Sequence, residues 1–329
     1  MRISIIIPVP PGVVPQSLER LARVSLPEDV EVIVAEGRCP SRQRNTAAAA
    51  ASGEILYFLD DDSLTFTGFL ERVSRHFADN TVTVVGGPSL TPAGDSAFQR
   101  AFGAALGSLV GGGGVRARYR KSGSVRETDD AELILCNLAV RRDVFAAHGG
   151  FDERLYPNEE NELLDRIRLN GGRLIYDPDF AVTRSQRPTI HAFIRQLFRY
   201  GRGRAEQTLI SGRVKAATVV PALFVGYLIV LSLMLNQITV LPLIIYALLV
   251  LGTCLLEGVR ARSPLVALLL PLVIPLLHIS YGIGMIYGLM VRSRRRIDSC
   301  EVRLRRYLVD KLVSAQGVMS RPTEKETEP

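Results

Sequence analysis

The sequence predicts an α/β domain with a mostly parallel sheet, followed by a C-terminal region of transmembrane helices. Strand-like and helix-like segments alternate over the first sixty residues, which is typical of parallel strands joined by right-handed crossovers. The segment 55–59 is apolar throughout, as expected of a central strand buried on both faces. Hydrophobic residues, 47% of the 329, are concentrated after residue 217. We therefore expect a globular domain at residues 1–212, a membrane region at 213–296 and a tail at 297–329.

Each element of the globular domain is predicted from a local pattern. Strands are expected where short apolar runs lie between polar turns, and helices where apolar residues recur every three or four positions. Gly53 follows the second predicted helix, at a favoured position for a C-terminal cap. The expected strands are 3–9, 31–35, 55–59 and 82–85, the expected helices are 15–24, 42–52 and 67–77, and a further apolar segment covers 133–140.

Residues 111–126 are expected to form an irregular segment. Four consecutive glycines and five basic side chains make a stable helix or strand unfavourable there. The combination suits a loop that closes over phosphates or anionic lipid head groups. An ordinary surface loop would have the same composition, so both interpretations stay open.

The net charge and the cysteines limit which partners and which cellular compartment are expected for this chain. The formal net charge is +7, largely from arginine, and beside an apolar C-terminal third it favours membrane lipids over nucleic acid as partners. The four cysteines, Cys39, Cys136, Cys254 and Cys300, form no CxxC pair. No disulfide or zinc framework is therefore expected, and a reducing cytoplasmic setting fits best. The N-terminal apolar run, residues 3–7, is too short for a signal peptide.

Three carboxylates, Asp60, Asp61 and Asp62, directly follow the predicted central strand. Because adjacent anions repel one another, a positive group is expected beside them. Ligands of open α/β sheets bind at this end of the strands. An Asp-x-Asp pair offers the hard oxygen ligands that Mg²⁺ or Mn²⁺ prefers, with a nucleotide diphosphate as the second partner of the metal. A solvated acidic loop is the alternative.

Two further polar clusters follow along the chain. Glu159, Glu160 and Glu162 exceed what the dipole of a first helical turn needs, so we expect a catalytic base among them, with capping as the alternative. Residues 195–204 combine arginines with Gln196 and two glycines. Arginine suits phosphate oxygens, whereas a basic helix on the membrane surface would explain the arginines but not the other residues.

In their order and spacing these motifs resemble the family 2 glycosyltransferases, which have the type A glycosyltransferase fold, over residues 3–205. The resemblance implies a Rossmann-like sheet and a nucleotide-sugar donor. Residues 278–284 are similar to the tail of succinoglycan-type exopolysaccharide glycosyltransferases. The motifs that carry the resemblance are 5–9, Arg44-Asn45, Asp60-Asp61-Asp62, Gly87-Pro88, 136–142, 150–153, Glu159-Glu160 and Gln196-x-x-Arg199-Tyr200.

The resemblance implies a role for each matching residue. Asp60 would contact the nucleotide, and Asp62, together with Asp60, would bind Mg²⁺ or Mn²⁺ on the donor diphosphate. Glu160 would be the base that deprotonates the acceptor hydroxyl, with Glu159 as the other candidate. Further nucleotide-sugar contacts are expected at Pro8, Arg44, Asp61 and Asn137, and acceptor or diphosphate contacts at Gln196, Arg199, Tyr200 and Arg202.

The sequence departs from the family pattern at three places. Residues 8–12 lack the usual Pro-x-Tyr-Asn-Glu, so that nucleotide contact is missing or rebuilt. Glutamate replaces aspartate at Glu160, which lengthens the base by one methylene group. Asp177-Pro178 leads to Arg184 where many relatives carry a histidine, so a histidine metal ligand is not expected.

The reaction that the resemblance implies is a single displacement at the anomeric carbon. The metal and the arginines would take up charge on the leaving nucleoside diphosphate while the base activates the acceptor oxygen on the opposite face, which inverts the configuration. A membrane hairpin beside such a site predicts a lipid-linked, polyprenyl acceptor, in cell-envelope or exopolysaccharide assembly. A polyprenyl-phosphate sugar synthase, a processive polysaccharide synthase and a non-catalytic scaffold are the alternatives.

Two apolar stretches, 218–235 and 238–256, are each long enough to cross a hydrocarbon core of about 30 Å and are expected to form a hairpin. Basic residues flank its outer ends, which places the catalytic domain in the cytoplasm and the protein in the inner, plasma membrane. A third stretch, 264–291, contains Pro271 and Pro275 and ends in arginines. A full span and a bent re-entrant segment are both compatible with it, and the bent form is favoured because prolines break a helix.

The region after the hairpin leads to two further expectations. Small residues around His278 suit close helix packing, and this histidine is expected to be a packed polar side chain rather than a catalytic one. Residues 301–313 are expected to form a basic amphipathic helix, and the chain after Gly317 is expected to be disordered.

Overall fold

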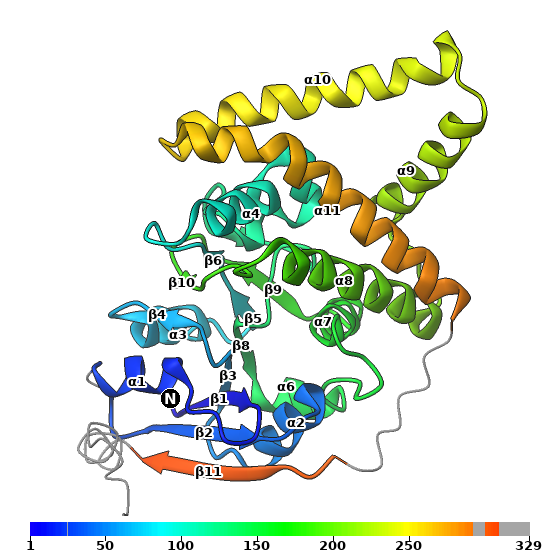
Figure 1. Cartoon of the computed structure of the whole chain (residues 1–329). Helices are drawn as coiled ribbons and strands as arrows, with labels where there is room; N and C mark the ends of the chain where they lie inside the picture. The colour runs from blue at the N-terminus through cyan, green and yellow to red at the C-terminus, as the bar shows by residue number, and fades with distance from the viewer. Residues whose placement is uncertain (25, 292–299, 309–329) are drawn as a thin grey trace, which may run out of the picture.

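The computed structural model describes residues 1–24, 26–291 and 300–308. A sheet domain lies at one end of the molecule and three long apolar helices lie at the other, with α4 (Ala97–Gly107) and α8 (Ile190–Ser211) between them (Figure 1). The other helices of the sheet domain are α1 (Gln16–Ala22), α2 (Pro40–Ala50), α3 (Phe69–Phe77), α5 (Leu109–Gly112), α6 (Arg142–Ala147) and α7 (Glu159–Leu169).

The main sheet has eight strands in the order β11-β2-β1-β3-β8-β5-β9-β7. The first three strands of the chain pair in parallel, as the sequence predicts, and β5 is parallel to β9. The sheet as a whole is mixed, because β8, β7 and β11 run antiparallel to their neighbours. The strands are β1 (Ile3–Val9), β2 (Val30–Glu36), β3 (Ile55–Leu59), β5 (Val82–Gly86), β7 (Arg126–Glu127), β8 (Asn137–Arg141), β9 (Arg173–Tyr176) and β11 (Arg303–Leu308).

A small second sheet lies beyond the ends of these strands. It consists of β4 (Leu64–Thr65), β10 (Val182–Thr183) and β6 (Ser89–Leu90), in that order. Strand β4 comes directly after the acidic motif, and β10 ends directly before Arg184. The small sheet therefore brings two segments that are more than a hundred residues apart in the sequence to one edge of the domain.

Strand β3 is the buried centre of the domain, as its apolar sequence predicts. Every residue of β3 is fully buried. Tyr57 belongs to the hydrophobic cluster on one face of the sheet, with Phe69 and Phe180 packed against its ring. Phe58 belongs to the cluster on the other face, where it contacts Phe151. Two packed faces fix the strand, and with it the direction in which the following carboxylates leave the sheet.

The helix predicted at 42–52 begins earlier, at Pro40, and ends before Gly53. Gly53 is therefore not its C-terminal cap, as the sequence led us to expect. A Cβ atom on Gly53 would lie 2.6 Å from the backbone nitrogen of Ser4, so a side chain at this position would collide with β1. The glycine is needed because two backbones approach each other closely before β3 begins.

The segment 111–126 is ordered, so the prediction of an irregular loop was wrong. It contains the end of α5 and a 3₁₀-helix, η1 (Gly113–Arg118). A Cβ atom on Gly112 would lie 1.8 Å from the carbonyl oxygen of Leu106, which shows that the glycine permits a tight turn against α4. Arg118 is buried rather than free at the surface. The glycines and arginines of this segment thus serve packing.

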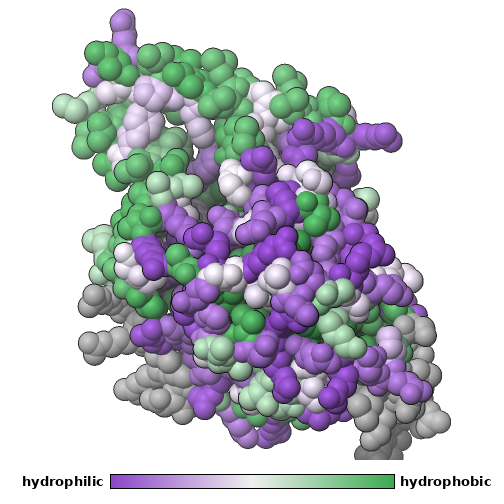
Figure 2. All heavy atoms as spheres, turned by 180° about the vertical axis from the view of Figure 1, so that it is seen from behind, coloured by the Kyte–Doolittle hydropathy of each residue, from purple (hydrophilic) through white to green (hydrophobic). Residues whose placement is uncertain are grey.

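Among the described residues, three helices are long and apolar enough to cross a membrane: α9 (Ala216–Leu233), α10 (Gln237–Arg260) and α11 (Pro264–Met290). Their outward side chains are strongly exposed, for example Leu233 at 79% and Ile238 at 84%. Figure 2 shows that apolar side chains gather over this end of the molecule, whereas the sheet domain is largely hydrophilic. This surface is consistent with the predicted membrane anchor.

Helix α11 is one continuous helix of 27 residues that includes Pro271 and Pro275, so the predicted break at the prolines is wrong. Packing holds it together, because α11 lies along α8 and also contacts α4, α9 and α10. Gly284 sits against the backbone of Phe198, where a Cβ atom would be 2.1 Å from the carbonyl oxygen. His278 is a packed polar side chain as predicted, between the Tyr246 hydroxyl at 2.9 Å and the Val110 carbonyl oxygen at 3.0 Å.

The described part of the C-terminal tail is the edge strand β11 rather than the predicted amphipathic helix. It pairs antiparallel with β2, with Tyr307 opposite Val32. Residues 309–313 of that prediction, and the tail after Gly317, lie outside the described residues. The sequence of this segment, in which Leu304 lies among arginines, is compatible with an exposed edge strand as well as with a helix. Pairing with β2 selects the strand.

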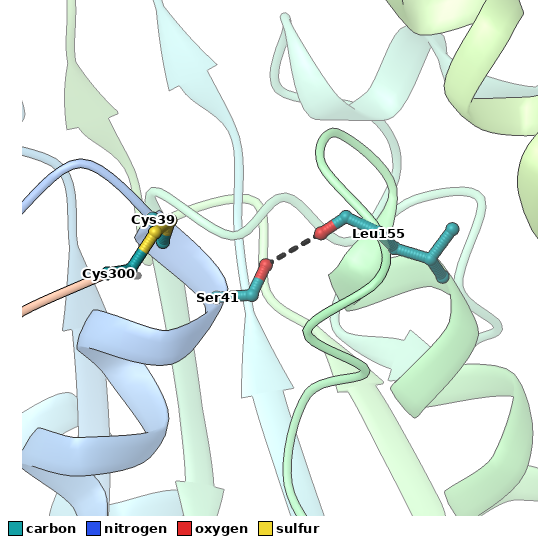
Figure 3. Close-up of a disulfide and its surroundings, with 4 residues drawn as sticks. All are labelled: Cys39, Ser41, Leu155 and Cys300. Carbon is teal, nitrogen blue, oxygen red and sulfur yellow. Dashed lines mark hydrogen bonds between the residues drawn. A yellow bond between two sulfur atoms is a disulfide. The ribbon is translucent and has the colours of Figure 1, made fainter. Parts of the chain in front are cut away.

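A disulfide fixes the start of this strand, contrary to the expectation that the cysteines stay unpaired. Cys39 and Cys300 are joined, with Cα atoms 6.0 Å apart and a sequence separation of 261 (Figure 3). Cys39 precedes α2, and nearby the Ser41 hydroxyl donates to the Leu155 carbonyl oxygen at 2.7 Å. A pairing over this separation gives no signal in cysteine spacing, which is why it could not be predicted.

Candidate active site

Arg44 joins the two acidic clusters that the sequence singles out. It lies on α2, and its side chain is only 5% exposed. One terminal nitrogen lies 2.8 Å from Asp60 Oδ1 and the other lies 3.0 Å from Glu159 Oε1. The structure therefore brings residues separated by about a hundred positions to one place, around a guanidinium group.

Arg184 binds the acidic motif through a second set of oxygens. Its Nε lies 2.6 Å from Asp62 Oδ1, and its Nη1 lies 3.3 Å from Asp60 Oδ2. Asp60 is thus held by Arg44 on one oxygen and by Arg184 on the other. The sequence marks position 184 only as a departure from the family pattern, and its contact with the motif could not be predicted from 122 residues away.

The charges at the motif are unequal. Burial raises the pKa of Asp60, but the charges of Arg184 and Arg44 outweigh burial, and the pKa is lowered from its usual value. Burial raises the pKa of Asp61, and repulsion from Asp62 and Asp60 acts in the same direction. Asp60 is therefore a firmly ionised carboxylate, whereas repulsion among the three adjacent acids disfavours the ionised form of Asp61.

The side chains at the motif do not fit a divalent metal in this arrangement. Within residues 1–24, 26–291 and 300–308, no three His, Cys, Asp or Glu side chains form a group that could hold a metal ion. The facing oxygens of Asp60 and Asp62 are both bound to Arg184. A guanidinium group thus lies where the predicted Mg²⁺ or Mn²⁺ would have its two protein ligands.

The two candidate bases, at the start of α7, have different surroundings. Glu159 is almost fully buried, and burial together with the charge of Glu160 raises its pKa to about 8 despite the neighbouring Arg44. Glu160 lies on the other side, where Arg118 Nη1 is 3.5 Å from its Oε1 and the Asn161 amide donates to the same oxygen at 3.3 Å. Glu159 is therefore tied to the acidic motif through Arg44, and Glu160 is tied to the 3₁₀-helix η1 through Arg118.

A hollow beside the motif is lined by two of the predicted acceptor residues, Gln196 and Tyr200. Gln196 and Tyr200 lie one turn apart on α8, and the Gln196 amide donates to the Tyr200 hydroxyl at 2.7 Å. Arg184 lines the same hollow. Burial raises the pKa of Tyr200, and the charge of Glu160 adds to it, so Glu160 lies within electrostatic reach of this tyrosine. The other lining residues are Ser89, Tyr119, Ile134, Ser185, Gln186 and Arg187.

Four predicted residues lie apart from this hollow. Arg199 points outward on α8 and is exposed, and Arg202 is engaged by Glu206, 3.3 Å away on the next turn. Pro8 is buried within β1. Asn137 has no exposed surface, because it accepts from the Tyr57 hydroxyl at 2.8 Å and donates to the Phe180 carbonyl oxygen. In this arrangement Asn137 supports the adjoining loop, and we leave it out of the proposed donor site.

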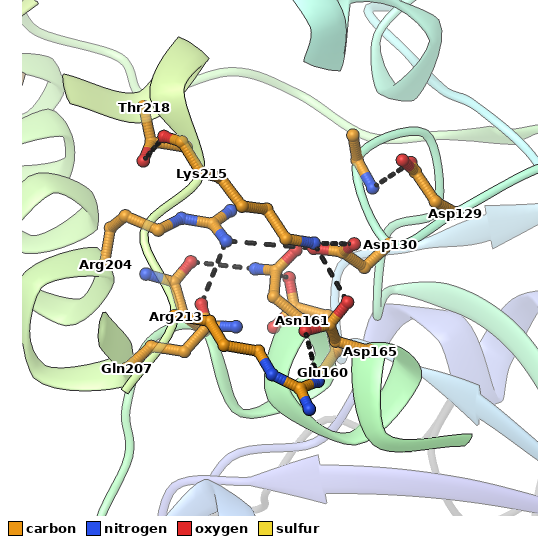
Figure 4. A network of polar contacts seen from close by, with 12 residues as sticks. Asp129, Asp130, Glu160, Asn161, Asp165, Arg204, Gln207, Arg213, Lys215 and Thr218 are labelled. Carbon is orange, nitrogen blue, oxygen red and sulfur yellow. Dashed lines mark hydrogen bonds and ion pairs between the residues drawn. The ribbon is translucent and has the colours of Figure 1, made fainter. Parts of the chain in front are cut away.

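A buried polar network behind Glu160 has no signature in the sequence. Arg118, which holds Glu160, also donates to the Asp130 carbonyl oxygen and the Asn161 side chain. Asp130 is fully buried and binds Lys215, the residue directly before α9 (Figure 4). Asp165 on α7 also binds this lysine, at 3.2 Å. The network therefore connects the helix that carries the candidate bases to the first apolar helix.

Comparisons with known proteins match part of the chain. Residues 14–147 match the family model Glycosyl transferase family 2. A pre-mycofactocin glycosyltransferase of Mycobacterium tuberculosis is 30% identical over 174 residues, which are 53% of this chain and 36% of that protein. The succinoglycan biosynthesis protein ExoA of Rhizobium meliloti is 29% identical over 194 residues, 57% of this chain and 56% of that protein. The matches thus span less than two thirds of these relatives.

A solved structure extends the likeness to most of the chain. The mannosyltransferase PcManGT from Pyrobaculum calidifontis, in complex with GDP-Man and Mn²⁺, superposes with a TM-score of 0.54 at 15% sequence identity. The match covers 89% of this chain and 88% of that one. At this identity the likeness concerns the fold.

Proposed function

We propose that the chain transfers a sugar from a nucleotide-diphosphate donor to a lipid-linked acceptor. The match of residues 14–147 to the Glycosyl transferase family 2 model and the likeness of the fold to a solved mannosyltransferase support this proposal. The single observation that carries the proposal is that Arg44 donates to both Asp60 and Glu159. It unites the carboxylates expected at the nucleotide with those expected at the acceptor. A scaffold protein without turnover would have no need of this arrangement.

The proposed reaction is a single displacement. Glu160 takes the proton of the acceptor hydroxyl, whose oxygen forms the new bond to the anomeric carbon of the sugar. The bond between that carbon and the diphosphate breaks with both electrons, and the nucleoside diphosphate leaves. Because the base and the leaving group lie on opposite faces of the sugar, the anomeric configuration is inverted.

The position of the acceptor follows from α8. This helix carries Gln196 and Tyr200 on the side of the hollow and packs along α11 with other residues. An acceptor whose lipid tail lies beside the apolar helices could therefore present its polar head group at the hollow. The Rhizobium relative is named for succinoglycan biosynthesis, which supports a role in exopolysaccharide assembly. We propose that the protein lies in the plasma membrane with its sheet domain in the cytoplasm, because basic residues flank the apolar hairpin. The Cys39–Cys300 disulfide is uncommon in that compartment, so the location rests on these basic residues and not on the cysteines.

The predicted Mg²⁺ or Mn²⁺ stays a prediction. Asp60 and Asp62 would be its protein ligands, and the ion would supply positive charge to the donor diphosphate. Both carboxylates are occupied by Arg184 in the structure, so no step of the proposed reaction is assigned to a metal.

The full-length protein in lipid nanodiscs provides the test. Sugar nucleotides are screened for transfer to polyprenyl-linked acceptors and to water-soluble sugars. We expect transfer to the lipid-linked acceptor, and Glu160→Gln should lower kcat about 10²–10⁴-fold with little change in donor KM, since an amide cannot take the proton. Glu159→Ala should instead raise donor KM, because Glu159 accepts from Arg44 and holds it in place.

Glu162→Gln is the matched control on the same helix. Glu162 pairs with Arg166 at 2.6 Å and contacts neither Arg44 nor Arg118, so its loss should leave both constants within about twofold. Equal rates with water-soluble and lipid-linked acceptors would contradict the proposed acceptor. Full activity of Glu160→Gln would contradict the proposed base.

A further inference from the structure

Arg184 has no role in the reaction as described so far, yet it makes two ion pairs with the acidic motif. Nε binds Asp62 at 2.6 Å and Nη1 binds Asp60 at 3.3 Å. A guanidinium group has five N–H donors in a fixed fork. The two ion pairs use Nε and Nη1, which leaves the donors of Nη2 for a ligand.

The side chain also reaches the hollow that we assign to the substrates. It is 20% exposed, and it lines this hollow together with Gln196 and Tyr200. A single arginine therefore links the carboxylates of the motif to the open space beside them. The planar fork of arginine suits two phosphate oxygens at once.

We propose that Arg184 is the resident cation of the donor site: its guanidinium group neutralises Asp60 and Asp62 and binds the donor diphosphate, so that donor binding needs no divalent metal. This inference depends on the proposed function, because it names the group that binds the diphosphate in that reaction. Arg44 assists from the other oxygen of Asp60 but is buried against Glu159.

Electrostatics favours the arginine over a metal ion at this position. A divalent cation bound between Asp60 and Asp62 would have to displace both ion pairs of Arg184 or lie a few ångströms from its positive charge. The small sheet fixes the arginine, because Arg184 directly follows β10 and its backbone nitrogen donates to the Leu90 carbonyl oxygen at 2.9 Å. The fold thus holds the guanidinium at the motif.

Nucleotide binding tests the assignment without requiring turnover. The purified full-length protein is titrated calorimetrically with UDP, GDP, ADP, CDP and dTDP, once with EDTA and once with Mn²⁺. We expect at least one of them to bind with a Kd that agrees within about threefold between the two conditions. Arg184→Ala should weaken this binding about tenfold or more in EDTA, and Arg184→Lys should weaken it less, because a charge remains.

Two further variants sharpen the test. Arg184→His introduces a metal ligand beside Asp60 and Asp62, so nucleotide binding should become dependent on Mn²⁺, and electron paramagnetic resonance should show bound Mn²⁺ in this variant alone. Arg173→Ala is the matched control: Arg173 also bridges two carboxylates, Asp79 and Glu127, at another edge of the domain. Its loss should leave nucleotide binding unchanged.

The outcomes separate this inference from the proposed function. If the wild-type protein binds a nucleoside diphosphate only with Mn²⁺, the role of Arg184 is wrong while the proposed function survives. If none of the five nucleotides binds under either condition, the proposed function fails and this inference fails with it. The wild-type comparison is decisive even where Arg184→Ala does not fold.

Discussion

At the scale of single residues, the site depends on one guanidinium that serves two carboxylates. Arg44 is shared between Asp60 and Glu159, and Glu160 adds a further negative charge nearby. Burial and that charge raise the pKa of Glu159 to about 8, well above its usual value of about 4.3. The folded protein therefore retains a proton on Glu159 over a pH range in which the unfolded chain has lost it.

This proton makes stability depend on pH. The folded state binds more protons than the unfolded state between about pH 4 and pH 8, so stability should fall as the pH rises through this window. Glu159→Gln removes the titrating group. The melting temperature of the variant minus that of the wild type should therefore increase by several degrees between about pH 5 and pH 8. Differential scanning fluorimetry in detergent measures both curves.

The control for this prediction is again Glu162→Gln, whose carboxylate is paired with Arg166 on the same helix. Its melting temperature should stay parallel to that of the wild type over the same range. A difference between Glu159→Gln and the wild type that does not change with pH would show that Glu159 is ionised in the folded protein throughout the range.

Sequence reasoning found the residues that belong to short motifs. Asp60 and Asp62 follow a visibly buried strand, and Gln196 and Tyr200 share a helical face, so local patterns were enough. It missed contacts made across long separations, such as that of Arg184 with the motif. The one available signal was the arginine at the position where many relatives carry a histidine.

At the scale of elements, the packing of α8 on α11 holds the sheet domain against the apolar helices. The contact is close because each helix places a glycine directly against the backbone of the other helix. A Cβ atom on Gly201 would lie 2.0 Å from the Tyr281 carbonyl oxygen, and one on Gly284 would lie 2.1 Å from the Phe198 carbonyl oxygen. Backbone cannot yield as a flexible side chain can, so these positions tolerate no side chain.

Gly284→Val should therefore separate the two helices. We expect a loss of stability of about 1–3 kcal/mol, seen as a melting temperature lower by several degrees in detergent, because overpacking forces the backbone apart. Gly252→Val on α10 is the matched control, since nothing lies within 4 Å of a Cβ atom there. Equal melting temperatures for the two variants would mean that the helices are not packed this closely.

The elements that sequence reasoning predicted correctly have a regular apolar pattern. Strands β1, β2, β3 and β5 and the apolar helices were all recognisable for this reason. The errors concern segments whose composition allows two outcomes. The glycines around Gly112 can give mobility or close packing, and the tail around Arg305 can form a helix or an edge strand. Tertiary contacts decide between such outcomes, and they are not visible in a local window.

At the scale of the whole molecule, the three apolar helices predict an arrangement across a membrane. If α9 and α10 cross it as a hairpin, the turn between them lies on the side opposite the sheet domain. Leu235→Cys, in this turn, should react with a membrane-impermeant maleimide added to intact cells. Asp29→Cys, on the sheet domain, should react only after permeabilisation.

Labelling of Asp29→Cys in intact cells would place the sheet domain outside and overturn the proposed cytoplasmic location. Labelling of neither site before permeabilisation would indicate that the hairpin does not reach the far surface. The native cysteines should not react with the maleimide, because Cys136 and Cys254 are buried and Cys39 is paired with Cys300.

The return of the chain to strand β11 has a mechanical consequence. The polypeptide leaves the sheet domain for the bilayer after α8 and comes back to the far edge of the same sheet, where the bond between Cys39 and Cys300 secures it (Figure 1). A domain that is connected to the apolar helices at two points rotates relative to them less freely than a domain connected at one point. In the proposed arrangement, this double attachment limits how far the candidate site can move from the lipid surface, which suits adding one unit to a carrier of set length better than following the end of a growing polymer.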